Sequence, residues 1–101
     1  MNKEEFNKYC AEVMGWALDI ENRYLDGIQF VIYAPDYSPY DDLNPRLPVV
    51  DELVKDATIT MEKLSHVLLF EHYMKLVIDG AYTIDKATKE FIMSTMHNKH
   101  T

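Results

Sequence analysis

The chain has 101 residues, of which 48% are hydrophobic and 27% are charged, and its formal net charge is −7. This length and composition predict one globular domain over residues 1–101 and argue against a disordered chain. The negative charge opposes binding to nucleic acid or to an anionic membrane, because both need clustered Lys and Arg side chains.

A cytoplasmic location is expected from three features of the sequence. The lone cysteine, Cys10, excludes an internal disulfide and is typical of a reducing compartment. The polar opening segment 1–5 does not resemble a signal peptide. The longest apolar stretch, 67–78, is interrupted by charged residues and is too short to span a bilayer.

The first segment predicts a helix over 3–15. Asn2 is a suitable N-cap, and Gly15 suits the left-handed backbone position that ends many helices. The apolar side chains recur at spacings of three and four, which is typical of one helical face: Phe6, Tyr9, Cys10, Val13 and Met14.

A strand is predicted over 28–34, after the turn signal Asp26-Gly27. Simple alternation would direct Ile28, Phe30 and Ile32 to one side of this strand. Pro35 ends it.

A turn-rich stretch over 35–45 precedes a predicted helix over 45–57, whose apolar face includes Val49, Val50 and Leu53. The segment 58–82 has two open interpretations, one long helix or two buried strands, because short apolar runs do not separate them. Gly80 marks a turn in either case. A final helix is predicted over 84–97.

These elements predict an α+β fold in which a small antiparallel sheet packs between helices. A mostly α fold is the alternative if 60–79 forms one long helix.

The most unusual feature is an acidic, tyrosine-containing region over 36–56. It holds six acidic residues against two basic ones, a net charge of −4. Tyrosines between acidic residues supply rigid contact area, so this region predicts a surface for a basic protein partner. Its candidate contact residues are Asp36, Tyr37, Tyr40, Asp41, Asp42, Asp51 and Glu52.

Enzyme motifs are absent from the sequence. Cys10 lies on an apolar helix face, the histidines lack supporting ligands, and the three glycines are too far apart to cradle a phosphate. We therefore expect no catalytic residues, no metal site and no cofactor.

Four short motifs carry a resemblance to a known family. In chain order they are Met14-Gly15-Trp16, Pro35-Asp36-Tyr37-Ser38, Asp42-Leu43-Asn44 and Val49-Val50-Asp51-Glu52-Leu53. This order resembles the phage ABA sandwich domain, in which helices pack on both sides of a small antiparallel sheet. The resemblance implies a phage accessory protein and assigns no catalytic residue.

Three functional hypotheses follow. The leading one is a non-enzymatic phage protein in the host cytoplasm that binds a basic host protein and inhibits a host defence system such as CRISPR immunity. The second is a structural homo-oligomer. The third is a protein that binds a small ligand or nucleotide.

Overall fold

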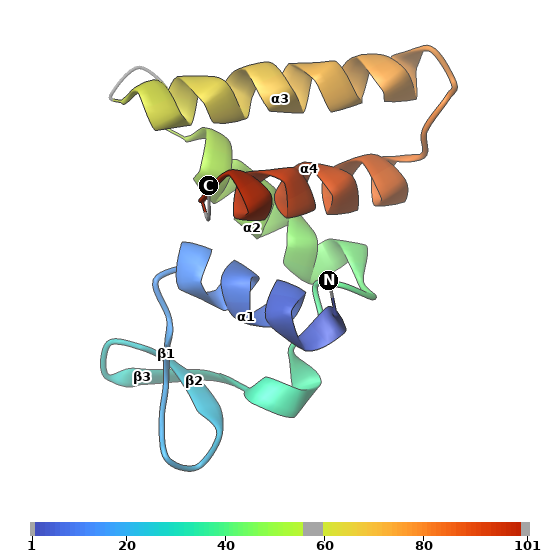
Figure 1. Cartoon of the computed structure of the whole chain (residues 1–101). Coiled ribbons are helices and arrows are strands. Elements are labelled where there is room, and N and C mark those ends of the chain that lie inside the picture. The colour runs from blue at the N-terminus through green and yellow to red at the C-terminus, as the bar shows by residue number, and fades with distance from the viewer. Residues whose placement is uncertain (1, 56–59, 100–101) are drawn as a thin grey trace. The chain divides into compact units, whose positions relative to one another are not determined.

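The computed structural model describes residues 2–55 and 60–99. Its helices and its three-stranded antiparallel sheet confirm the predicted α+β class (Figure 1). The elements are α1 (Lys3–Val13), β1 (Ala17–Leu18), β2 (Arg23–Asp26), β3 (Gln29–Tyr33), the 3-10 helix η1 (Ala34–Asp36), α2 (Leu43–Val54), α3 (Met61–Ile78) and α4 (Ile84–Lys99).

The chain divides into two compact units, residues 1–49 and residues 50–101, and α2 contributes to both. The prediction of a single domain over 1–101 stays a prediction.

Helix α1 begins and ends at the predicted capping residues. The side chain of Asn2 accepts a hydrogen bond from the Glu5 amide at 2.8 Å. At the other end Gly15 has a φ of +80°, and the Trp16 amide donates to the carbonyl of Ala11 at 3.0 Å. This is the Schellman arrangement, which satisfies carbonyls that the last turn leaves unpaired. The buried face is Phe6, Tyr9, Cys10 and Ala11.

The sheet has the order β1-β2-β3, and a two-residue turn at Gly27 and Ile28 joins β2 to β3. Gly27 has a φ of +70°, which this tight turn favours at its first position. The predicted strand over 28–34 therefore corresponds to β3.

One prediction about the direction of the β3 side chains is wrong. Tyr24 pairs with Ile32, while its neighbour Leu25 pairs with Phe30, so a bulge at this point adds one residue to β3. Residues paired across a strand share a face, and neighbours along a strand do not. Phe30 and Ile32 consequently lie on opposite faces of the sheet, not on the same one.

Helix α2 begins at Leu43, two residues before the predicted start, and includes Pro45 in its first turn. Its predicted apolar residues Val49, Val50 and Leu53 are buried. The predicted end at residue 57 lies outside the described residues.

The undecided segment forms one helix, α3, and the two-strand interpretation is wrong. The Thr60 hydroxyl caps the start of α3 by accepting from the Lys63 amide at 3.1 Å, and Gly80 has a φ of +82° just past its end. The sheet nevertheless remains, because its strands come from residues 17–33, so the mostly α alternative does not hold.

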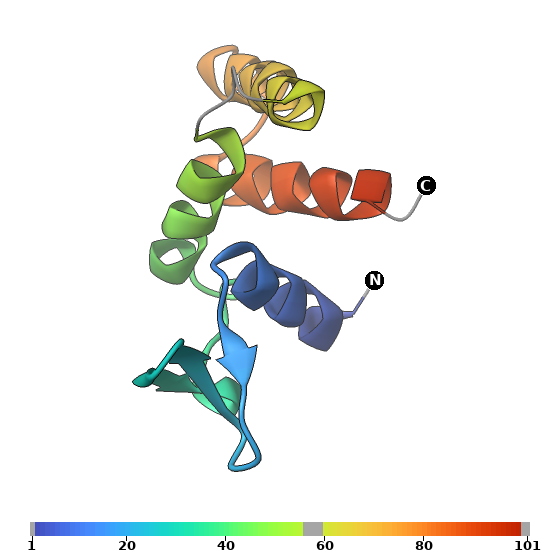
Figure 2. The same cartoon turned by 90° about the vertical axis from the view of Figure 1, so that its left-hand side faces the viewer.

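Helices α3 and α4 lie side by side in both views of the second unit (Figures 1 and 2). The rings of Phe70 and Phe91 pack edge to face with centroids 5.5 Å apart, and the hydroxyls of Tyr73 and Ser94 are 2.9 Å apart. The apolar stripe predicted for the last helix is buried: Ala87, Phe91, Ile92, Thr95 and Met96.

Candidate protein-binding surface

The backbone of the acidic loop, residues 36–42, accepts hydrogen bonds from a buried arginine. Arg46 is fully buried at the start of α2, and its guanidinium donates through Nε to the carbonyl of Pro39 at 2.8 Å and through Nη2 to the carbonyl of Tyr40 at 3.0 Å. Hydrogen bonds from a charged donor are about twice as strong as neutral ones. Arg46 thus fixes the loop through its backbone carbonyls and not through its acidic side chains.

Helix α1 supplies a second set of anchors for the acidic loop. The Asn7 side chain accepts a hydrogen bond from the Tyr40 amide at 3.0 Å. The ammonium of Lys3 pairs with Asp41, whose carboxylate also accepts from the Ser38 hydroxyl at 2.9 Å. The neighbouring carboxylate of Asp41 raises the pKa of Lys3, so this amine stays charged.

The predicted acidic residues differ in their ion pairing and in their position in the chain. Asp36 and Asp42 are exposed, and Asp41 is exposed but paired with Lys3. Asp51 and Glu52 lie further along α2, in the second unit, where the Glu52 carboxylate is 3.5 Å from the ammonium of Lys55. The structure therefore brings Asp36, Asp41 and Asp42 together in one loop and places Asp51 and Glu52 in another part of the chain.

Tyr37 does not present its ring at the surface, in contrast to the sequence-based interpretation. Its side chain is 4% exposed and packs edge to face against Trp16 and Tyr24, with centroids 5.2 and 5.7 Å away. Burial raises the pKa of its hydroxyl, and this hydroxyl is buried without a hydrogen-bond partner among the described residues. A tyrosine in a polar loop is expected at the surface, but this loop folds back over an aromatic cluster.

Tyr40 is half-buried and remains at the loop. Its ring packs edge to face on Phe6 of α1, with centroids 5.4 Å apart. It is the tyrosine of the pair that still offers contact area beside the carboxylates.

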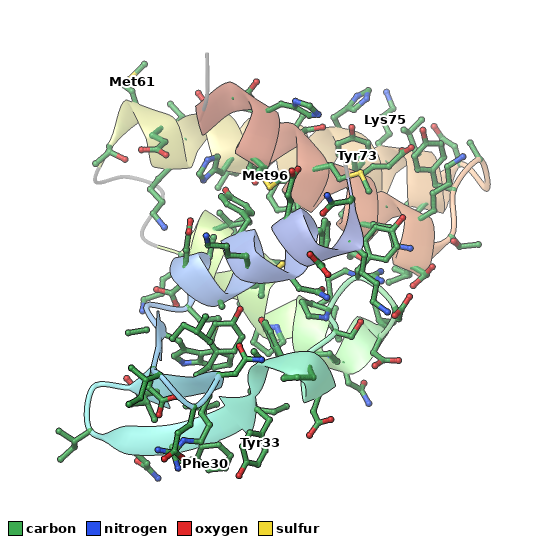
Figure 3. All side chains as sticks on the ribbon, turned by 60° about the horizontal axis from the view of Figure 1, so that its bottom comes forward. Phe30, Tyr33, Met61, Tyr73, Lys75 and Met96 are labelled. Carbon is green, nitrogen blue, oxygen red and sulfur yellow. The ribbon has the colours of Figure 1, made fainter. Side chains whose placement is uncertain are left out.

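Sequence reasoning missed an aromatic surface on the outer face of the sheet. The rings of Phe30 and Tyr33 are 48% and 50% exposed, and their centroids are 5.3 Å apart (Figure 3). The guanidinium of Arg23 lies 5.9 Å above the Phe30 ring, within the range of a cation–π interaction. The bulge in β3 is what puts Phe30 on this face, and alternation alone does not reveal a bulge.

The ion pairs of Arg23 add charge to the edge of this aromatic face. Its guanidinium is 2.9 Å from the Asp19 carboxylate and 3.3 Å from that of Glu21. Burial of the Asp19 carboxyl acts to raise its pKa, but hydrogen bonds from Arg23 and from the Glu21 amide outweigh it and hold the pKa below its usual value of 3.8.

A second exposed apolar surface, also missed, lies on α3. The side chains of Met61, Leu64, Leu68 and Ile78 are all exposed, and Figure 3 shows Met61 pointing outward from the helix. A periodicity argument could have found it, because α3 carries apolar residues on more than the one face that packs on α4.

Two further side chains of reactive types, Cys10 and His66, are buried. Cys10 is buried, and desolvation raises the pKa of its thiol to about 12 although the charge of Arg46 acts in the opposite direction. A protonated, inaccessible thiol is a poor nucleophile. His66 is buried with Nδ1 3.0 Å from the carbonyl of Leu53, so this nitrogen acts as the donor.

A small apolar cavity of about 240 Å³ opens in the first unit. None of its lining residues carries a charge: Met14, Trp16, Val31, Ile32, Tyr37, Pro45 and Pro48. Sites for drug-sized ligands are usually larger, at roughly 300–1,000 Å³. A nucleotide would also need cationic or backbone donors for its phosphates, which this lining does not supply.

Two further properties concern the part of the chain that the structure describes. In residues 2–55 and 60–99, no group of three or more His, Cys, Asp and Glu side chains is placed so that it could hold a metal ion. None of the helices in these ranges combines the length and apolarity that crossing a membrane requires. No protein-family model, curated protein or solved structure matches the chain.

Proposed function

We propose that this chain is a non-enzymatic binding protein whose acidic loop docks on a basic surface of a partner protein. The observation that carries the proposal is the anchoring of the loop. Arg46, Asn7 and Lys3 hold residues 36–42 in place, while the carboxylates of Asp36 and Asp42 stay exposed. A binding loop that is ordered beforehand loses less conformational entropy on association.

Burial of Arg46 also determines which charges of this region are exposed. Its positive charge counts in the net −4 of residues 36–56, but its guanidinium is fully buried beneath the loop. The guanidinium therefore makes no surface contact, and because Lys3 pairs with Asp41, the exposed charge of the loop that is unpaired among the described residues comes from Asp36 and Asp42. Electrostatic complementarity of this kind speeds association and selects partners more than it adds affinity.

The biological setting is proposed from the resemblance to the phage ABA sandwich domain. A phage accessory protein in the host cytoplasm would use such an acidic surface to occupy a basic site on a host protein. Basic sites that normally hold nucleic acid, including those of CRISPR immunity, have the chemistry that an acidic competitor fits.

Charge reversal tests the acidic loop directly. The full chain is immobilised and incubated with nuclease-treated lysate of a candidate host at physiological ionic strength. The double variant Asp36→Lys, Asp42→Lys is expected to lose a basic partner that the unmodified chain retains. The matched control is Asp26→Lys, which reverses an exposed carboxylate at the hairpin turn. If both variants retain every specific partner equally, the acidic loop is not the binding surface.

Salt dependence gives a second readout of the same interaction. Exposed charges separated by more than about 8 Å are screened at 0.15 M ionic strength. The association rate of the unmodified chain should fall as salt rises, and that of the double variant should not.

A further inference from the structure

Helix α3 has two opposite faces, and only one of them packs inside the second unit. Phe70 and Tyr73 face α4, and His66 is buried. On the other side six exposed residues follow one another at spacings of three, four, three, four and three: Met61, Leu64, Leu68, Glu71, Lys75 and Ile78. This is the a and d spacing of a heptad repeat, the pattern with which two helices pack together.

We propose that this outer stripe pairs with the same stripe of a second copy of the chain, with the two α3 helices running antiparallel. The charges in the stripe select the direction. A parallel pair would set Glu71 against Glu71 and Lys75 against Lys75 of the second copy, and like charges repel. In an antiparallel pair whose twofold axis crosses the two helices at the level of residue 73, each Glu71 lies opposite Lys75 of the other copy.

The apolar residues around these charges fall into the same antiparallel register. Leu68 lies three residues before Glu71, and Ile78 lies three residues after Lys75. The register that joins Glu71 to Lys75 of the second copy therefore joins Leu68 to Ile78 as well. A twofold interface requires this reciprocity, in which residue i faces j and j faces i.

The stripe needs a partner more than an ordinary helix surface does. Leu68 is 59% exposed and Ile78 is 83% exposed. Single exposed apolar residues are common, but several of them gathered along one helix face mark an interaction site. In the part of the chain that the structure describes, neither Glu71 nor Lys75 takes part in an ion pair, so both charges are available to a second copy. Figure 3 shows Lys75 projecting outward, whereas Tyr73 lies on the side of α4.

Sedimentation velocity of the full chain over a micromolar concentration series tests the proposal. The unmodified chain is expected to dimerise. Leu68→Glu places an acid in the apolar layer and should raise the dissociation constant at least about tenfold. Ile28→Glu is the control, because it places the same acid at a fully exposed apolar residue in the first unit. A concentration-independent monomer, or a dimer that Leu68→Glu leaves intact, overturns the proposal.

A charge swap between two chains tests the register. Glu71→Lys and Lys75→Glu should each weaken self-association, because each variant sets like charges against one another. An equimolar mixture of the two variants should restore the dimer as a mixed pair. A pairing of Glu71 with Lys75 within one helix predicts no such rescue by mixing. Circular dichroism of each variant reports whether α3 itself stays folded, and failure of the mixture of folded variants to associate overturns the register.

A mixed disulfide separates the antiparallel pair from a parallel one. Leu68→Cys mixed with Ile78→Cys should cross-link between the two variants under mild oxidation, whereas Leu68→Cys alone should not. Cross-linking of Leu68→Cys to itself would show a parallel pair and overturn the antiparallel arrangement. These outcomes are independent of whether the acidic loop binds a partner.

Discussion

Replacement of Arg46 by methionine should destabilise the protein and loosen the acidic loop together. The methionine retains much of the volume of the arginine side chain but donates no hydrogen bond. The carbonyls of Pro39 and Tyr40 then lose donors at 2.8 and 3.0 Å. A buried carbonyl that loses its hydrogen bond costs about 1–3 kcal/mol, and less where the contact is only partly buried, as at Tyr40. Removal of the buried charge returns part of that cost, since a buried guanidinium carries its own desolvation penalty.

The expected net loss is about 2–3 kcal/mol in the free energy of unfolding. This is a large share of the roughly 5–15 kcal/mol that stabilises a typical protein. For a chain of this size it corresponds to a fall of about 10–20 °C in melting temperature. Urea denaturation followed by circular dichroism measures it, with Arg23→Met as the control. Arg23 is only partly buried, and solvent screens its ion pairs with acidic neighbours, so its replacement should cost much less stability.

The same variants link stability to binding. Arg46→Met should also weaken capture of any partner that depends on Asp36 and Asp42, because the loop that presents these carboxylates is no longer held. The reasoning is refuted if Arg46→Met unfolds within about 0.5 kcal/mol of the unmodified chain, the scatter expected of an ordinary surface substitution.

Three further outcomes can be checked on the full chain. Tyr37→Phe removes a buried hydroxyl without a partner among the described residues, so thermal denaturation should show unchanged or higher stability, and a loss above about 1 kcal/mol would contradict this. The Asp19 carboxyl should titrate below pH 3.8 by NMR, and Arg23→Gln should raise the pKa of Asp19. Because folding lowers this pKa, ionised Asp19 stabilises the fold above pH 3.8, and this stabilisation is lost as the pH falls through the folded pKa. Cys10, whose thiol has a pKa of about 12, should resist alkylation at pH 8 in the folded chain and react in urea, whereas rapid alkylation without denaturant would contradict its burial.

The sequence predicted the capping residues of α1 and the turn after α3, because caps depend on local chemistry. Asn2 and Gly15 bound the first helix as expected, and Gly80 marks the turn after α3. The last helix is capped in the same local way, because the Thr83 hydroxyl accepts from the Lys86 amide at 3.1 Å. Each of these contacts spans three to five residues, so a short window of sequence contains both partners.

Features that depend on distant residues were not predictable in this way. The burial of Tyr37 results from packing against Trp16 and Tyr24, which come from other segments. Helix α3 was ambiguous because apolar residues on two opposite faces obscure the helical period. Within the candidate surface, the acidic composition of the loop was visible in the sequence. The anchoring by Arg46 was not, because an arginine is rarely buried in full.

The bulge in β3 has a consequence for the solubility of the folded chain. β3 forms one edge of the sheet, and its sequence Gln29-Phe30-Val31-Ile32-Tyr33 contains no charge and no proline. A short uncharged segment of this kind is prone to stack with copies of itself into fibrils. An extra residue bends the strand and interrupts its regular row of hydrogen-bonding groups, so a second edge finds no flat template against which to align. The same irregularity that exposes Phe30 thus makes the edge a poor nucleus for fibre growth.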